Sequence, residues 1–185
     1  MVSGAEQGPQ HRVLGVVLRG QRDVTTFTDD HGTVEQSTSA ATGLVGDVFV
    51  GTIANEIFTG TSVTDIALGG GGADSLSGNA GDDTLAGGTG NDTVNGDGGN
   101  DLIRFGVGDG FDIVNGGGGG DTIAATANNT VIGLRAITGV EQITSGGFTG
   151  VTIFGTTGVE NLNFGGVTLV GIVSVNGGGG NDTYI

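Results

Sequence analysis

The chain has 185 residues, of which 43 are glycine, and its aromatic content is 5%. This composition excludes a thick globular core, because glycine contributes no buried side chain and loses the most backbone entropy on ordering. Glycine does not recur at every third position and there is a single proline, which excludes collagen. The net charge of −15 makes nucleic acid a poor partner, since binding it requires a basic surface.

The absence of cysteine excludes disulfides, thiolate metal sites and cysteine nucleophiles. No stretch approaches the roughly 18 apolar residues that are needed to span a membrane. The N-terminal apolar run at residues 13–18 is too short for a secretory signal peptide, and arginines flank it. If the protein is exported, we expect a signal at the other end of the chain.

Residues 1–41 are the first of three expected regions. Residues 1–10 are a polar lead-in, and residues 36–41 are a connector. Between them, residues 13–35 have a strand-like pattern with turn residues at 29–32, which favours a β-hairpin. We expect this region to cap a solenoid, because an uncovered solenoid end invites edge-to-edge pairing.

A nine-residue repeat organises the second region, residues 42–124. Four contiguous units start at residue 69 and read GGGGADSLS, GNAGDDTLA, GGTGNDTVN and GDGGNDLIR. After a two-residue insertion at 105–106, the repeat resumes as VGDGFDIVN and GGGGGDTIA. The sixth position of these units is always aspartate: Asp74, Asp83, Asp92, Asp101, Asp112 and Asp121. The eighth position is always aliphatic: Leu76, Leu85, Val94, Ile103, Val114 and Ile123.

The same register extends back to residue 42 in three units that have lost most of their glycines. Their sixth positions are Asp47, Glu56 and Asp65, and their eighth positions are Phe49, Phe58 and Ala67. We expect these units to be coils of the same solenoid with weak or absent ion sites, as is usual for terminal repeats.

The repeat has a physical logic of its own. Glycines at the first, second and fourth positions permit φ > 0 and let carbonyl oxygens approach one another. The aspartate adds a hard anionic oxygen, and calcium prefers six to eight such oxygens. The last three residues form a short strand with one inward side chain. Two units give about 18 residues per coil and place alternate loops about 4.8 Å apart, close enough for one ion to bridge them.

This unit resembles the calcium-binding repeat of the RTX (repeats-in-toxin, haemolysin-type) family, G-G-x-G-x-D-x-U-x, where U is a large apolar residue. The resemblance implies a parallel β-roll that folds in extracellular calcium after type I secretion. It implies ligation by aspartates paired as Asp83–Asp101–Asp121 on one edge and Asp74–Asp92–Asp112 on the other. It also implies backbone carbonyl ligands at Gly72, Gly81, Gly90 and Gly99. We expect about four to six calcium ions.

Residues 125–185 are the third region, in which we expect the solenoid to continue without calcium loops. The segments ITGVEQIT (137–144) and TTGVENLN (156–163) are similar and lie 19 residues apart. They predict that Glu141 and Glu160 stack one coil apart, either as solvated carboxylates, which we favour, or around an ion. The chain closes with one full repeat, GGGGNDTYI, whose Asp182 has no later loop to pair with. Either this ion site is unfinished or a neighbouring molecule completes it.

Catalytic motifs are missing from the sequence, so we expect no enzyme. The only histidines are His11 and His31, and no HExxH, GxSxG or phosphate-loop GK[ST] pattern occurs. Paired carboxylates are numerous enough for a glycosidase. They fall on the calcium register, however, and no cleft-forming aromatic subsites are expected beside them.

The sequence therefore predicts an all-β fold, a parallel β-roll or β-solenoid with about 18 residues per coil and a strand-rich N-terminal cap. Three functions stay open. The first is a calcium-folded, self-assembling subunit of an extracellular fibre or surface layer, since contact between non-identical ends gives open filaments. The second is a C-terminal secretion and folding module, because the tail at 182–185 is similar to the tails of type I secreted proteins. The third is a surface protein that binds ice or carbohydrate, although no regular outward T-x-T ladder is present.

Overall fold

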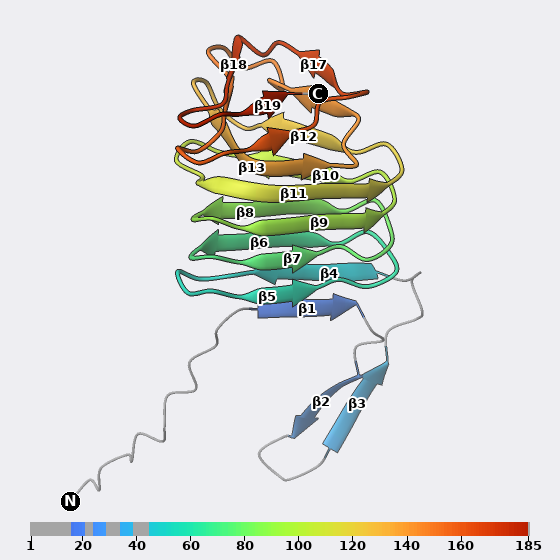
Figure 1. The fold of residues 1–185 in the computed structure, drawn as a ribbon. Coiled ribbons are helices and arrows are strands. Elements are labelled where there is room, and N and C mark those ends of the chain that lie inside the picture. The colour runs from blue at the N-terminus through green and yellow to red at the C-terminus, as the bar shows by residue number, and fades with distance from the viewer. Residues whose placement is uncertain (1–15, 21–23, 29–33, 39–44, 185) are drawn as a thin grey trace, which may run out of the picture.

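The structure is a computed structural model that describes residues 16–20, 24–28, 34–38 and 45–184. These residues form strands and no helix, and from residue 45 onward the strands wind into a solenoid of stacked coils (Figure 1). The predicted all-β parallel solenoid is therefore confirmed. None of the described residues forms a helix long and apolar enough to cross a membrane.

Two sheets form the walls of the solenoid, and the chain alternates between them. The first sheet contains, in spatial order, β1 (Val16–Gly20), β4 (Val45–Val50), β6 (Ile66–Gly71), β8 (Thr84–Thr89), β10 (Leu102–Phe105), β12 (Thr122–Ala125), β14 (Gln142–Thr144) and β17 (Thr168–Val170). The second contains β5 (Ile57–Thr59), β7 (Ser75–Ser77), β9 (Thr93–Gly98), β11 (Phe111–Gly118), β13 (Val131–Thr138), β15 (Thr152–Phe154) and β18 (Ser174–Asn176). In this second sheet β16 (Asn161–Leu162) pairs with β13 and with β19 (Thr183–Tyr184). All pairings from β4 onward are parallel.

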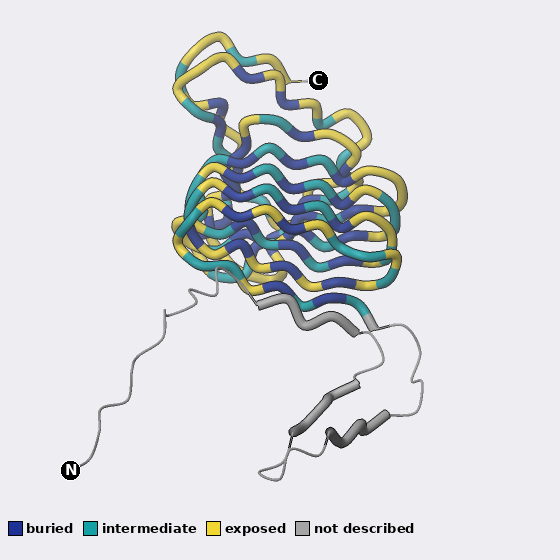
Figure 2. The backbone as a smooth tube through the Cα atoms, turned by 90° about the horizontal axis from the view of Figure 1, so that it is seen from below, coloured by how far each residue is buried: buried dark blue, intermediate teal, exposed yellow. Residues whose placement is uncertain are grey.

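The core is a column of inward side chains from each sheet, which Figure 2 shows as buried positions repeated from coil to coil. In the repeats up to residue 124 these are the eighth-position residues, which are at most 4% exposed, whereas Tyr184 in the last repeat is 47% exposed. The three degenerate units follow the same register, since Phe49 pairs with Ala67 and Phe58 with Leu76. The rings of Phe49 and Phe58 stack with centroids 5.1 Å apart and fill the first coil. The extension of the register back from the perfect repeats is thus confirmed.

The coils do not keep the expected length of 18 residues throughout. Equivalent acids lie 18 residues apart up to Asp101, and 20 residues apart from Asp92 to Asp112 and from Asp101 to Asp121. The last coil takes 22 residues from Glu160 to Asp182. The insertion at 105–106 begins this change, because Phe105 extends β10 by one buried position and pairs with Ala125.

The expected stacking of Glu141 on Glu160 was wrong. Gln142, next to Glu141, pairs with Thr122 and Thr168 in the first sheet. Leu162, which follows Glu160 closely, pairs with Ile137 in the second sheet. The two similar segments therefore lie in different sheets, because the positions of their apolar residues in the core set the register rather than the 19-residue offset.

The strands of the expected N-terminal hairpin pair with each other, and a further strand, which the sequence did not place, pairs with the solenoid. Strand β1 pairs antiparallel with β4, next to the first coil. Strands β2 (Val24–Thr28) and β3 (Val34–Thr38) pair antiparallel with each other, as in a hairpin. The lead-in at 1–10, the turn at 29–32 and residues 39–41 of the connector lie outside the described residues. The region boundaries at 41 and 124 stay predictions.

Candidate metal sites along two carboxylate ladders

Two ladders of carboxylates run along the solenoid, one beside each sheet. The first ladder consists of Asp65, Asp83, Asp101, Asp121 and Glu141; the second consists of Glu56, Asp74, Asp92 and Asp112. In each ladder, the backbone N–H of one acid donates a hydrogen bond to the carboxylate one coil later. The donor–acceptor distances are 2.6–2.9 Å. The partners that the family resemblance implied therefore lie next to one another, although their metal ligation stays a prediction.

One oxygen of most of these carboxylates has no protein partner. The hydrogen bond along the ladder occupies Oδ1, whereas Oδ2 is buried without a hydrogen bond in Asp74, Asp83, Asp92, Asp101 and Asp121. An unpaired buried charge costs free energy unless a counter-ion compensates it. If each acid of a ladder is called a rung, the arrangement of these oxygens suits a cation bound between consecutive rungs.

The consensus glycines have distinct structural roles. A Cβ atom at the first position of a unit would overlap Oδ2 of the aspartate five residues later, for example at Gly78 and Gly96. The fourth-position glycines have φ of +111° to +137°, which side-chain-bearing residues rarely adopt: Gly72, Gly81, Gly90 and Gly99. The equivalent glycine one coil later lies against the carbonyl oxygen of each. A Cβ atom at Gly90 would overlap the Gly72 carbonyl oxygen, and one at Gly99 would overlap the Gly81 carbonyl oxygen. These carbonyls thus lie between stacked loops, where an ion would bind.

The donor set fits calcium. In the described part of the chain, no three Asp, Glu or His side chains are placed so that they could hold one metal ion by themselves. Two consecutive acids of a ladder instead offer two carboxylates, and the loops between them offer backbone carbonyl oxygens. Calcium accepts six to eight such oxygens and tolerates irregular geometry, whereas zinc prefers nitrogen and sulfur ligands.

Burial makes the charged ladders unfavourable without a cation. Desolvation, reinforced by neighbouring carboxylates, raises the pKa of Asp83 to about 7, against the hydrogen bond from Asp65. Desolvation likewise raises the pKa of Asp112 to about 7, although the Arg135 guanidinium acts in the opposite direction. The pKa values of Asp74, Asp92, Asp101 and Asp121 are also raised, chiefly by burial. A bound divalent cation would remove this penalty.

Sequence reasoning missed a second set of contacts between the loops. The fifth-position side chains of Asn91 and Asn100 accept hydrogen bonds from Phe111 N–H at 3.0 Å and Gly120 N–H at 2.9 Å, one coil later. Asn55 and Asp82 make equivalent contacts with the next loop. The signal was present in the sequence, since Asn or Asp recurs immediately before the ladder acid.

The sequence also failed to identify the partner of Asp182. Asp182 Oδ1 accepts a hydrogen bond from Glu160 N–H at 3.1 Å, so an earlier loop of the same chain already lies beside it. The 22-residue spacing of these two acids concealed the contact from a nine-residue count.

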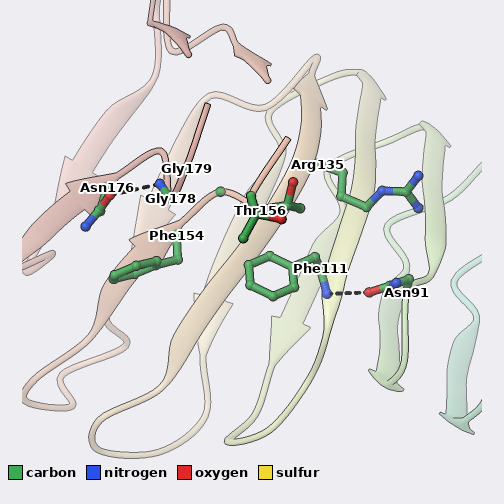
Figure 3. A pocket seen from close by; sticks show the side chains of 10 residues that line it. Asn91, Phe111, Arg135, Phe154, Thr156, Asn176, Gly178 and Gly179 are labelled. Atoms are coloured by element: carbon green, nitrogen blue, oxygen red, sulfur yellow. Dashed lines mark hydrogen bonds between the residues drawn. The ribbon is translucent and has the colours of Figure 1, made fainter. Parts of the chain in front are cut away.

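A pocket of about 750 Å³ lies on the outside of the second sheet (Figure 3). The rings of Phe111 and Phe154 line it, together with the side chains of Asn91, Arg135 and Asn176. Sequence reasoning did not identify this pocket, because Phe111 belongs to the repeat at 107–115 and Phe154 to a later coil.

Comparison with known proteins agrees with the repeat geometry. The family model described as the RTX calcium-binding nonapeptide repeat matches four times, at residues 59–94, 68–103, 77–111 and 171–185. No curated protein and no solved structure matches the chain. The first three matches cover the central rungs of both ladders, and the fourth covers Asp182. The chain therefore carries RTX calcium-binding repeats, and its solenoid is a calcium-binding β-roll.

Proposed function

We propose that this protein is an exported, calcium-folded β-roll that acts as a structural subunit and assembles end to end outside the cell. The observation that carries the proposal is the buried, unpartnered carboxylate oxygen that recurs from rung to rung. Without calcium, self-repulsion of a chain with net charge −15 keeps it expanded. Calcium binding then contributes its free energy directly to folding.

The proposed ions lie between consecutive rungs. Four of them bridge neighbouring aspartates of the six repeats, two ions in each ladder, and further acids at the ends of the ladders raise the expected number to as many as six. The proposed aspartate ligands are Asp74, Asp83, Asp92, Asp101, Asp112 and Asp121, with carbonyl oxygens of Gly72, Gly81, Gly90 and Gly99. We assign no catalytic role, since these carboxylates are committed to the ladders.

The ends of the solenoid support assembly. Among the described residues, the second sheet begins at β5 and ends at β18 and β19, and no further strand pairs with these outer strands (Figure 1). The last coil also exposes large apolar side chains, including Leu169, Val170 and Val173. Such edges favour pairing with another chain. Contact between two non-identical ends produces open filaments.

Export is proposed from the same chemistry. Extracellular fluids supply calcium at the concentrations that weak oxygen-ligand sites require. The alternative is that this β-roll serves as a C-terminal secretion and folding module for another domain. In that case calcium would compact the chain without joining copies of it.

Sedimentation velocity of the purified chain separates these functions. In chelator we expect an expanded monomer, and in millimolar calcium we expect large species that chelator reverses. A compact monomer in calcium would favour the secretion module. A sedimentation coefficient that calcium does not alter would contradict both functions.

The pocket favours a second candidate function, carbohydrate binding. Two phenylalanine rings provide stacking surfaces, and Arg135, Asn91 and Asn176 provide hydrogen-bond donors beside them. Titration with a panel of neutral and acidic oligosaccharides tests this function. Phe154→Ala should abolish binding, whereas the exposed Phe148, which does not line the pocket, offers the matched control Phe148→Ala. Equal effects of the two substitutions would contradict the carbohydrate site.

A further inference from the structure

We propose that Glu160 and Asp182 bind a calcium ion between them and that this ion closes the last coil. The proposal rests on the calcium chemistry proposed above for the two ladders. It adds a loop that the repeat pattern does not identify, since residues 155–160 read GTTGVE and lie outside the matched residues. Asp182 would then find its calcium partner within its own chain.

The hydrogen bonds of the last coil reproduce those of the calcium loops. In the second ladder, Asp74 N–H donates to Asp92 Oδ1 at 2.8 Å, and Glu160 N–H donates to Asp182 Oδ1 at 3.1 Å. The residue after the second acid also donates a backbone hydrogen bond to the carbonyl oxygen of the first acid. Thr93 N–H donates to the Asp74 carbonyl at 2.8 Å, and Thr183 N–H donates to the Glu160 carbonyl at 2.9 Å. A coil of 22 residues thus presents two acids as the 18-residue coils do.

The glycines of the last repeat occupy equivalent positions. A Cβ atom at Gly177 would overlap Asp182 Oδ2, as one at Gly87 would overlap Asp92 Oδ2. Gly178 and Gly180 have φ of +87° and +105° and approach backbone carbonyl oxygens of the earlier loop. The carbonyl oxygens concerned belong to Thr156 and Gly158. The two loops therefore supply carbonyl oxygens as well as two carboxylates.

Glu160 holds an oxygen that the protein leaves unsatisfied. Its side chain is 7% exposed, and its Oε1 accepts a hydrogen bond from Thr156 Oγ. Its Oε2 is buried with no hydrogen-bond partner, beside Gly155, where the Gly177 carbonyl oxygen also lies. A buried anionic oxygen in this position requires a cation.

Glu56 shows that a glutamate four residues after a threonine does not by itself leave an open oxygen. Glu56 also follows a threonine by four residues, and Thr52 Oγ donates to its Oε1 at 2.5 Å. Its Oε2, however, accepts a hydrogen bond from Thr52 N–H at 3.2 Å, so both of its oxygens are satisfied. The same sequence spacing therefore leaves Oε2 without a hydrogen bond in Glu160, whereas Oε2 accepts one in Glu56.

Calcium at this position would order the end of the solenoid. Strand β19 follows Asp182 directly and pairs with β16, which follows Glu160. The ring of Tyr184 stacks on Phe164 with centroids 6.4 Å apart. The edge available for assembly would then form only when calcium is bound.

Tyr184 makes the site observable by itself. It is the single tyrosine in a chain without tryptophan, so tyrosine fluorescence and tyrosine-sensitised terbium luminescence report on the last coil. Circular dichroism reports on the whole roll in the same titration. In the wild-type chain we expect calcium to change the Tyr184 emission and to displace terbium that Tyr184 sensitises.

The variants Glu160→Gln and Asp182→Asn should raise the calcium midpoint of the Tyr184 signal by about tenfold or more. Loss of an outer-shell partner alone weakens metal binding by roughly 10- to 100-fold. The circular dichroism midpoint of the roll should not change, and Glu56→Gln should leave the Tyr184 midpoint as in the wild type.

A Tyr184 midpoint that Glu160→Gln leaves unchanged would overturn the inference while the function of the roll stands. Absence of sensitised terbium emission from the folded wild-type chain would overturn it without any variant. If circular dichroism shows no calcium transition at all, the proposed function itself fails.

Discussion

The roll at residues 65–121 and the later coils at 131–162 solve the same packing problem with different chemistry. Most strands of the roll bury one apolar side chain and are followed or preceded by a buried acid. The later coils bury more apolar residues, and β13 alone contributes Ile132, Leu134 and Ile137. No aspartate occurs between residues 122 and 181. The comparison teaches that a glycine-rich coil with little apolar surface needs a further source of stability, for which we propose bound calcium, whereas a coil with more buried apolar residues is held by its core.

The boundary between the regions lies at a different place in each ladder. In the first ladder, Glu141 accepts a hydrogen bond from Asp121 N–H at 2.7 Å and continues the series. In the second, the pairing of β11 with β13 shifts register after Asp112, and Arg135 is the extra residue. The guanidinium of Arg135 acts to lower the pKa of Asp112, against its burial. A protein cation thus lies next to the last acid of the second ladder.

The largest expected contrast comes from removing ligands in one region and core atoms in the other. Asp92 and Asp101 each belong to two proposed sites, so the double variant Asp92→Ala/Asp101→Ala removes a ligand from all four central ions. We expect it to raise the calcium midpoint of β-structure by more than about 100-fold or to abolish the transition. Circular dichroism during a calcium titration measures this, and an unchanged transition would contradict the site assignment.

Ile153→Ala is the matched change in the later coils. Ile153 is fully buried, and truncation of such a side chain lowers the free energy of unfolding by about 2–5 kcal/mol. We expect this loss in urea denaturation at saturating calcium, with no change in the number of calcium ions bound. A reduced stoichiometry would show that the two regions do not differ as described.

How much the sequence predicted differs between the same two regions. The nine-residue repeat predicted the parallel solenoid, the inward residues and the neighbours of Asp83 and Asp92, because glycine loops of fixed length leave one register. After Ile103 the loops no longer have a fixed length, so the repeat no longer determines the register. The insertion at 105–106, the extra residue Arg135 and the 22-residue last coil each depend on which apolar residue fills the core, which local similarity does not specify.

The acidity of the ladders predicts opposite effects of pH with and without calcium. The pKa values of Asp83 and Asp112 are about 7 in the metal-free fold, above the ordinary value of 3.8. Folding therefore favours the protonated carboxyl groups. Their contribution to stability is fully present below about pH 3.8 and is lost as pH rises through about 7. With excess calcium the ionised form is the ligand, so apparent calcium affinity should rise with pH across the same range.

Hydrogen exchange at several pH values locates this effect. In chelator, protection of residues 66–118 should decrease between pH 4 and pH 8, and calcium should restore it. Protection of residues 131–154 should change less, since this segment contains a single acidic residue, Glu141, and neither Asp83 nor Asp112. Equal pH dependence in both segments would mean that burial of the ladders does not control the stability of the roll.

The smallest expected contrast lies within a single loop of the roll and tests why the repeat needs glycine where it does. A Cβ atom at Gly96 would overlap the carboxylate of Asp101, a proposed ligand, and also the Gly116 carbonyl oxygen. Gly98 has no positive φ, and a Cβ atom there would meet only Asn79 O, at 3.6 Å. We expect Gly96→Ala to cost about 1–3 kcal/mol and to weaken calcium binding. Gly98→Ala should be neutral or stabilise by up to about 1 kcal/mol, because it restricts the unfolded chain.

Calcium-dependent thermal unfolding of the two variants measures the difference. If both cost the same, the first glycine serves backbone freedom alone and does not make room for the carboxylate.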